Sequence, residues 1–178
     1  MEYYEITIAG LKRRLPLCRV SESLRIGAFV MFGDVEITVA SAAALLEKAP
    51  AFDVVLTAEA KGIPLAYEMA RQSGKPYVLA RKYPKLYMPE PVAVPVHSIT
   101  TDKEQTLYLD ESELHSMKGK RVLIVDDVIS TGESLRALQT LADVAGAITV
   151  GCGTVLAEGD AAKRDDIFFL EPLPLFFD

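Results

Sequence analysis

The segment that most constrains the fold runs from residue 121 to residue 144. Arg121–Val125 is apolar after its first residue, and two aspartates, Asp126 and Asp127, follow it directly. A turn of hydroxyl residues and glycine comes next, and then Glu133–Val144, whose leucines recur at helical spacing. This order predicts a β–α unit of a parallel sheet. The aspartates are expected at the carboxyl end of the strand, the edge where open α/β sheets bind ligands.

The same alternation of strand and helix patterns occurs through most of the chain. Leu135, Leu138 and Leu141 are expected to face the sheet. Tyr3–Ala9 and Lys12–Leu17 predict an N-terminal hairpin around Gly10. The other strands are expected at Asp53–Thr57, Pro76–Ala80, Val92–Thr100, Gln105–Asp110 and Thr149–Leu156, and the other helices at Asp34–Lys48 and Ile63–Gln72.

Bulk composition bounds the class of protein. A chain of 178 residues with 50% hydrophobic content suits one domain with one core. A net charge of −6 argues against a general nucleic-acid surface, which needs a basic excess. We find neither a secretory signal nor 18 consecutive apolar residues, so we expect a cytoplasmic protein without a membrane segment. Cys18 and Cys152 fit no metal-ligand spacing and are expected to be reduced and buried.

The turn after the aspartates has the composition of a phosphate site. Ser130, Thr131, Gly132 and Ser134 combine hydroxyls, a glycine and the unpaired N–H groups of a helix N-terminus. Acids just before such a turn can bind ribose hydroxyls or lie near a divalent metal. The alternative is a polar turn with an ordinary Ser/Thr helix cap. Two adjacent carboxylates fit that alternative poorly because they repel each other.

The string VLIVDDVISTGES, residues 122–134, closely resembles the signature of the type I phosphoribosyltransferases. The resemblance implies that the ligand is 5-phosphoribosyl-1-pyrophosphate with Mg²⁺. Asp126 and Asp127 would be the catalytic acids, meeting the ribose hydroxyls directly or through the metal. Ser130, Thr131, Gly132, Glu133 and Ser134 would hold the 5′-phosphate. Glu133 replaces a glycine common there in adenine enzymes, so its carboxylate must point away from the phosphate.

A second match follows the predicted strand at Asp53–Thr57. Glu59, Ala60, Lys61 and Gly62 are similar to the Glu-Ala-Arg-Gly loop that binds pyrophosphate in adenine phosphoribosyltransferases. Lys61 stands where that family has arginine, which keeps the charge but loses the planar fork. In many members this loop contains a cis peptide, so the resemblance implies one here.

A third match is Arg81 and Lys82 with nearby Lys85, which resemble an Arg-Lys pair before a mobile loop in purine phosphoribosyltransferases. Residues 61–85 carry six basic residues against Glu68 alone, a local charge of +5 that would attract a polyanion. The alternative is a solvated basic face. The proline-rich segment 82–91 is expected to be a lid. In dimeric relatives part of this basic group reaches the neighbouring site, which implies a homodimer.

The family resemblance implies an α/β fold with a parallel-sheet core, helices on both faces and a small N-terminal hood. The chain would be a single domain with a hood piece at 1–30, a core at 31–156 and a C-terminal tail and strand at 157–178. The acceptor would be a purine base. His97–Lys103 looks more like xanthine phosphoribosyltransferases and purine repressors than like adenine enzymes, so the expected type is adenine or xanthine.

Other classes fit less well. No GxxxxGK[ST] string occurs, and Gly151 and Gly153 lack the third glycine of a dinucleotide site. Receiver domains carry paired acids much earlier in a shorter chain. His97 and His115 have no recognisable catalytic partner and are expected to be surface or strand residues. The remaining rival is a non-catalytic protein that binds the same sugar pyrophosphate. Repressors of that kind add a DNA-binding domain, for which the residues before the core are too few.

Overall fold

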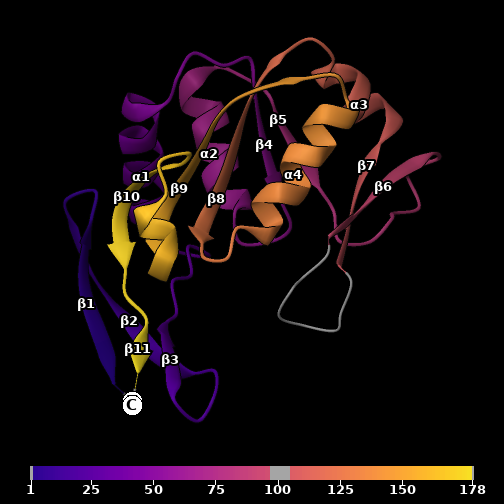
Figure 1. Ribbon diagram of the computed structural model, residues 1–178. Helices are drawn as coiled ribbons and strands as arrows, with labels where there is room; N and C mark the ends of the chain where they lie inside the picture. The colour runs from indigo at the N-terminus through magenta and orange to yellow at the C-terminus, as the bar shows by residue number, and fades with distance from the viewer. Residues whose placement is uncertain (1, 97–104, 178) are drawn as a thin grey trace.

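The computed structural model describes residues 2–96 and 105–177 and shows a five-stranded parallel sheet at its centre (Figure 1). Strand order in this sheet is β10-β9-β8-β4-β5, and every neighbouring pair is parallel. Its strands are β4 (Val54–Ala58), β5 (Tyr77–Ala80), β8 (Arg121–Ile129), β9 (Ile148–Glu158) and β10 (Phe168–Leu173). The expected parallel-sheet core is confirmed.

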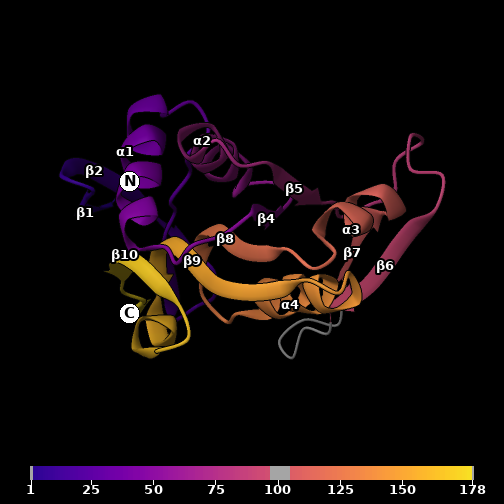
Figure 2. The same cartoon turned by 90° about the horizontal axis from the view of Figure 1, so that it is seen from above.

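Helices cover both faces of the sheet, as predicted (Figure 2). One face packs against α1 (Val35–Lys48) and α2 (Ile63–Ser73), and the other packs against α3 (Glu111–Met117) and α4 (Glu133–Val144). Successive strand residues serve opposite faces. In β8, Val122 and Ile124 belong to the core beneath α4, whereas Leu123 and Val125 belong to the core beneath α1 and α2.

Two smaller sheets flank the core. The first has the order β1-β2-β3-β11 and consists of β1 (Tyr3–Ile8), β2 (Leu11–Arg19), β3 (Leu24–Gly27) and the C-terminal β11 (Phe176–Phe177). It joins the two ends of the chain in one antiparallel hood, and the predicted hairpin is its first pair. The second sheet is the antiparallel pair β6 (Pro91–Val96) and β7 (Gln105–Asp110). A five-residue 3₁₀ helix, η1 (Gly159–Lys163), follows β9.

The strand that carries the aspartates is longer than predicted. β8 continues to Ile129, so Asp126 and Asp127 lie within the strand rather than after it. The reason is its neighbour β9, which runs to Glu158 and pairs Thr154 with Asp126 and Ala157 with Ile129. Backbone hydrogen bonds to β9 thus extend the strand through a polar stretch, where the sequence pattern alone predicts that the strand ends.

Other differences from the expectations are local. Cys18 is exposed on β2, because the hood sheet is too small to enclose it, whereas Cys152 is buried as expected. Helices α3 and η1 were not anticipated, since both are too short to show a clear period. In the described part of the chain, no helix is long and apolar enough to cross a membrane.

Helix α4 is fixed to the sheet by its leucines, so truncating one should open a cavity. Leu138 is 1% exposed in the middle of the helix. We expect Leu138→Ala to lower the free energy of unfolding by about 2–5 kcal/mol, measured by urea denaturation. Arg136→Ala, on the exposed side of the same helix, is the control and should change it by less than about 0.5 kcal/mol. Equal losses would contradict the packing described.

Candidate active site

Two adjoining cavities lie at the carboxyl ends of β4 and β8. The larger, about 270 Å³, is lined by Ala58, Glu59, Ala60, Lys61, Lys82, Leu107, Asp126, Asp127, Val128 and Ser134. The smaller, about 140 Å³, is lined by Asp126 and by residues 128–135. Asp126, Val128 and Ser134 line both cavities, so Asp126 lies between a compartment that contains Lys61 and Lys82 and a hydroxyl-rich one.

Asp126 lines both compartments, and Asp127 lines the larger one. Asp127 is 2% exposed, and its Oδ2 lies 3.3 Å from Nζ of Lys61. Its backbone N–H donates to Oδ1 of Asp126 at 2.9 Å. Burial, together with repulsion from Asp127, raises the pKa of Asp126 to about 8. Paired carboxylates with a raised pKa at the edge of a cavity are typical of ligand sites.

The loop after β4 packs directly onto these acids. A Cβ on Gly62 would overlap Oγ1 of Thr57 and lie 2.9 Å from Oδ1 of Asp126, so only glycine allows this approach. Thr57 is itself held by β8, because its Oγ1 donates to the carbonyl of Val125 at 2.8 Å. The Glu59–Ala60 peptide is cis, as the resemblance implied. The contact between Gly62 and Asp126 thus joins the two predicted motifs in space.

The turn between β8 and α4 forms the smaller cavity. Gly132 has φ of +81° and is the residue at which α4 begins. N–H groups in the first turn of a helix lack intrahelical partners, and together with the hydroxyls of Ser130, Thr131 and Ser134 they can bind an anion. Glu133 lines this cavity as the first residue of the helix.

Arg164 is a neighbour of this turn that the sequence reasoning missed. A Cβ on Gly132 would overlap Nη1 of Arg164, so the guanidinium lies directly against the glycine. Asp166 orients it by accepting from Nε at 2.8 Å and from Nη2 at 2.6 Å. No local signal links positions 132 and 164, because only the folded sheet brings η1 beside the turn.

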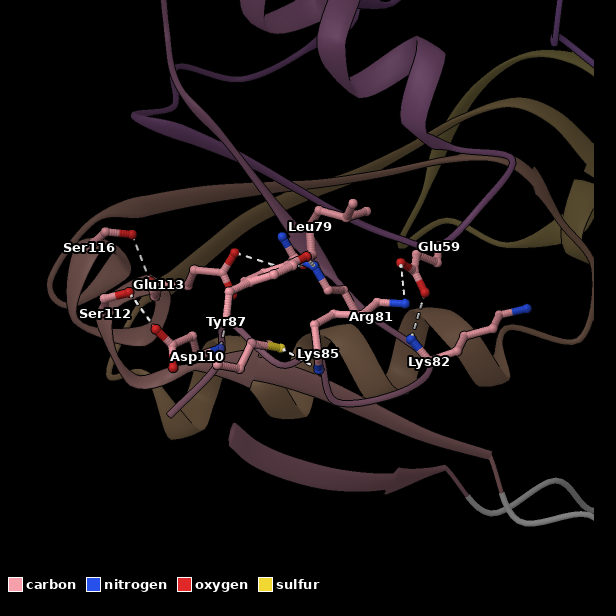
Figure 3. Close-up of polar contacts among 11 residues, drawn as sticks. Glu59, Leu79, Arg81, Lys82, Lys85, Tyr87, Asp110, Ser112, Glu113 and Ser116 are labelled. Atoms are coloured by element: carbon pink, nitrogen blue, oxygen red, sulfur yellow. Dashed lines mark hydrogen bonds and ion pairs between the residues drawn. The ribbon is translucent and has the colours of Figure 1, made fainter. Parts of the chain in front are cut away.

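The three basic residues of the third match, Arg81, Lys82 and Lys85, have different surroundings in the structure. Lys82 lines the larger cavity, but Arg81 and Lys85 do not. The Arg81 guanidinium is bonded to Glu113, Tyr87 and the carbonyl of Leu79 (Figure 3). Nζ of Lys85 lies 3.6 Å from Glu59. Among the described residues, the cations that line the cavity are therefore Lys61 and Lys82.

His115 takes no part in this arrangement. His115 is exposed on α3 and lines neither cavity. His97 and the segment His97–Lys103, on which the expected type of base depends, lie outside the described residues. Among the residues that the structure describes, no three His, Cys, Asp or Glu side chains gather to hold a metal. Among the described residues, the carboxylates that line the larger cavity are those of Glu59, Asp126 and Asp127.

The family model for the phosphoribosyl transferase domain matches residues 35–172. This chain belongs to the phosphoribosyl transferase domain family. The match includes both cavities, and the family is the one that the sequence motifs indicated.

Proteins similar in sequence are named as purine phosphoribosyltransferases. The chain is 40% identical over 112 residues to a hypoxanthine/guanine phosphoribosyltransferase of Methanococcus voltae, covering 63% of this chain and 56% of that protein. It is 38% identical over 103 residues to a xanthine phosphoribosyltransferase of Brevibacillus brevis, covering 57% and 52%. The chain thus spans little more than half the length of these relatives.

Solved structures with the same fold include adenine phosphoribosyltransferases. That of Thermoanaerobacter pseudethanolicus superposes with a TM-score of 0.68 at 20% identity, covering 96% of this chain and 95% of that one. That of Trypanosoma brucei, in complex with AMP, pyrophosphate and ribose-5-phosphate, gives 0.60 at 21% identity, covering 77% and 64%. At such identity the likeness concerns the fold.

Gly132 provides a test of the contact with Arg164. Gly132→Ala should lower the free energy of unfolding by about 1–2 kcal/mol for the left-handed backbone and by up to about 0.5 kcal/mol more, because the flexible end of Arg164 must move away from the added Cβ. Gly74→Ala is the matched control, since Gly74 has φ of +68° but nothing within 4 Å of its added Cβ. Urea denaturation measures both. Equal losses would show that Arg164 does not pack against the turn.

The raised pKa of Asp126 predicts a stability that depends on pH. The folded protein favours the protonated carboxyl, so ionisation costs stability increasingly as pH rises from about 4 and levels off above the pKa of about 8. Asp126→Asn should therefore be more stable than the wild type at pH 8, by on the order of 1 kcal/mol or more, and about equal to it near pH 4. Thermal unfolding across this range measures the difference. A gap that widens at low pH would contradict the assignment.

Proposed function

We propose that this protein transfers the 5-phosphoribosyl group from 5-phosphoribosyl-1-pyrophosphate to a ring nitrogen of a purine base and releases pyrophosphate. One observation carries the proposal: Asp126 lines both a compartment of N–H and hydroxyl groups and a compartment that contains Asp127 and two lysines. A ribose with a phosphate at one end and a pyrophosphate at the other would place one anion in each compartment and its hydroxyls beside the acids.

In this proposal the smaller cavity binds the 5′-phosphate through Ser130, Thr131, Ser134 and the backbone N–H groups of the turn. Lys61 and Lys82 bind the pyrophosphate. Asp126 and Asp127 accept hydrogen bonds from the ribose hydroxyls. The chain thereby fixes both ends of the ligand and holds the anomeric carbon over Val128, the residue shared by the two cavities with Asp126 and Ser134.

The charges also suit the transition state. As the bond from the anomeric carbon to pyrophosphate breaks, positive charge develops on the ribose and negative charge on the leaving group. The carboxylates are placed to stabilise the first, and the two lysines to stabilise the second. Closure of segment 82–91 would exclude water that otherwise hydrolyses the ligand.

The aspartates also suit Mg²⁺ arriving with the ligand. Oδ2 of Asp127 is buried and accepts no hydrogen bond from the described residues, although Nζ of Lys61 lies 3.3 Å from it. A ribose hydroxyl or a cation at this oxygen would take the place of that ammonium. Oxygen ligands are what Mg²⁺ prefers. Bound there, the ion would neutralise charge on the pyrophosphate.

For the acceptor we propose a 6-oxopurine, that is hypoxanthine, guanine or xanthine. The names of the relatives at 36–42% identity support this class, whereas the adenine enzymes share the fold at about 20% identity. The test is an assay of pyrophosphate release with adenine, hypoxanthine, guanine and xanthine in turn. Release with adenine alone would refute the acceptor class.

A homodimer in the cytoplasm is also proposed. Phe32, Val35 and Tyr67 are 52%, 73% and 56% exposed around a hollow between α1 and α2, which supports a self-association surface. The division into hood piece, core and tail stays a prediction.

Asp127→Asn tests the role of the acids. The substitution keeps the size of the side chain but removes the charge beside Lys61. We expect the protein to fold while kcat falls by roughly a hundredfold or more, measured as pyrophosphate release. Asp160→Asn, at an exposed site on η1, is the control and should retain full activity.

An unchanged rate for Asp127→Asn would remove the aspartates from the mechanism. Binding of the sugar pyrophosphate by the wild type, detected by thermal shift, without turnover of any base would favour the non-catalytic alternative. The ion pair between Lys61 and Asp127 is compatible with that alternative, because it engages the cation that would otherwise meet the leaving group.

A further inference from the structure

The segment 81–90, between β5 and β6, begins with two adjacent basic residues whose side chains part. Lys82 projects along the larger cavity, which it lines, while Arg81 turns toward α3 (Figure 3). Two neighbouring cations of similar reach therefore have different surroundings. Their contacts show what each is able to do.

Nε and Nη1 of Arg81 are engaged by protein groups. Its Nη1 donates to the carbonyl of Leu79 at 2.7 Å and to Oε1 of Glu113 at 2.9 Å, and its Nε donates to the hydroxyl of Tyr87 at 2.8 Å. The side chain is only 15% exposed. A guanidinium can serve acceptors in several directions at once because its N–H groups form a planar fork, which an ammonium does not.

The backbone of Arg81 is fixed as well. Its N–H and carbonyl exchange hydrogen bonds with Tyr108 of β7 at 2.9 and 2.8 Å. Glu113, which receives the guanidinium, accepts the backbone N–H of Asp110 at 2.9 Å and so caps the start of α3. Arg81 thus links β5, β7, α3 and, through Tyr87, the far part of its own segment.

Lys82 is held from the opposite side. Its backbone N–H donates to Oε2 of Glu59 at 3.0 Å, and Oε1 of the same carboxylate lies 3.6 Å from Nζ of Lys85. Glu59 belongs to the loop that lines the cavity and that packs on Asp126 through Gly62. The main chain at Lys82 is therefore clamped between Arg81 and Glu59, which leaves its ammonium exposed at the cavity.

We propose that Arg81 is a positioning residue which, together with Glu113 and Glu59, presents Lys82 to the cavity, and that Lys82 is the member of the pair that contacts the diphosphate of the ligand. This inference rests on the proposed function. It replaces the direct pyrophosphate contact that the sequence resemblance implied for Arg81 with a role exerted through Lys82.

The experiment measures three variants of the linkage: Arg81→Lys, Glu113→Gln and the double variant that carries both changes. Lys82→Ala is measured beside them. Arg81→Lys keeps the charge but loses the fork, so we expect KM for the sugar pyrophosphate to rise by roughly tenfold or more with a smaller change in kcat. Glu113→Gln, which touches no ligand, should raise KM in the same way. The double variant should be no worse than Arg81→Lys, because both changes break one linkage. Lys82→Ala should raise KM directly.

Arg121→Gln is the matched control. Arg121 forms an equivalent fork with Asp53 at 2.8 and 3.0 Å, but at the opposite end of β8. Loss of the Arg121–Asp53 fork should leave KM within about twofold of the wild-type value, because substitutions far from the cavity do not couple to ligand binding. Thermal unfolding without ligand monitors the fold of each variant. If one fails to fold, Tyr87→Phe, which removes a single contact to Arg81, takes its place and should raise KM.

Two results would overturn the proposal. The first is a wild-type KM for Arg81→Lys together with a raised KM for Arg81→Ala. A positive charge at position 81 would then be enough for ligand binding, and the planar fork would not be needed. The other is an unchanged KM in Glu113→Gln beside an impaired Arg81→Lys. If the wild type turns over no purine, the proposed function fails, and binding of inorganic pyrophosphate by the same variants then tests the positioning role. Absence of pyrophosphate binding by the wild type would refute both.

Discussion

The close approach of Gly62 to Asp126 is the contact on which the site depends. It requires β4 and β8 to be neighbours in register, a glycine after β4 and an acid within β8. Parallel pairing satisfies the first requirement, and the bond from Thr57 to the carbonyl of Val125 reinforces it in the interior. Once the loop lies on the acid, Lys61 reaches Asp127, and Glu59 is in place to hold Lys82. Remote parts of the sequence therefore become one site through strand pairing and the close packing of this loop on the acid.

Much of the fold could be predicted from the sequence because its main elements are regular. Helix α4 has its leucines at helical spacing, and β4 is a short, mostly apolar segment, so each pattern has one simple explanation. The extension of β8 could not be read in this way, since it depends on pairing with β9. Helix α3 did carry a signal: Asp110 and Glu113 have the spacing of a capping box, although the helix itself is too short to show a period.

The candidate site was predictable where one segment supplies several groups. Asp126 and the turn at 130–134 are close in sequence, so their joint lining of the smaller cavity follows from local structure. Arg81 shows the opposite case. Its charge suggested a ligand contact, but the direction of its side chain is decided by Glu113, which lies on another element. Arg164 could not be found from the sequence at all, because its neighbour Gly132 gives no sign of what packs against it.

The raised pKa of Asp126 has a consequence for how any cationic or metal-bearing ligand is bound. At neutral pH much of this carboxyl retains its proton, because burial and Asp127 disfavour the charge. A ligand that brings positive charge beside it lowers the pKa, and the proton leaves. Capture of the ligand is then also an acid-releasing event. Its apparent affinity would strengthen as the solution becomes more alkaline, and the heat of binding would include the protonation of whichever buffer receives that proton.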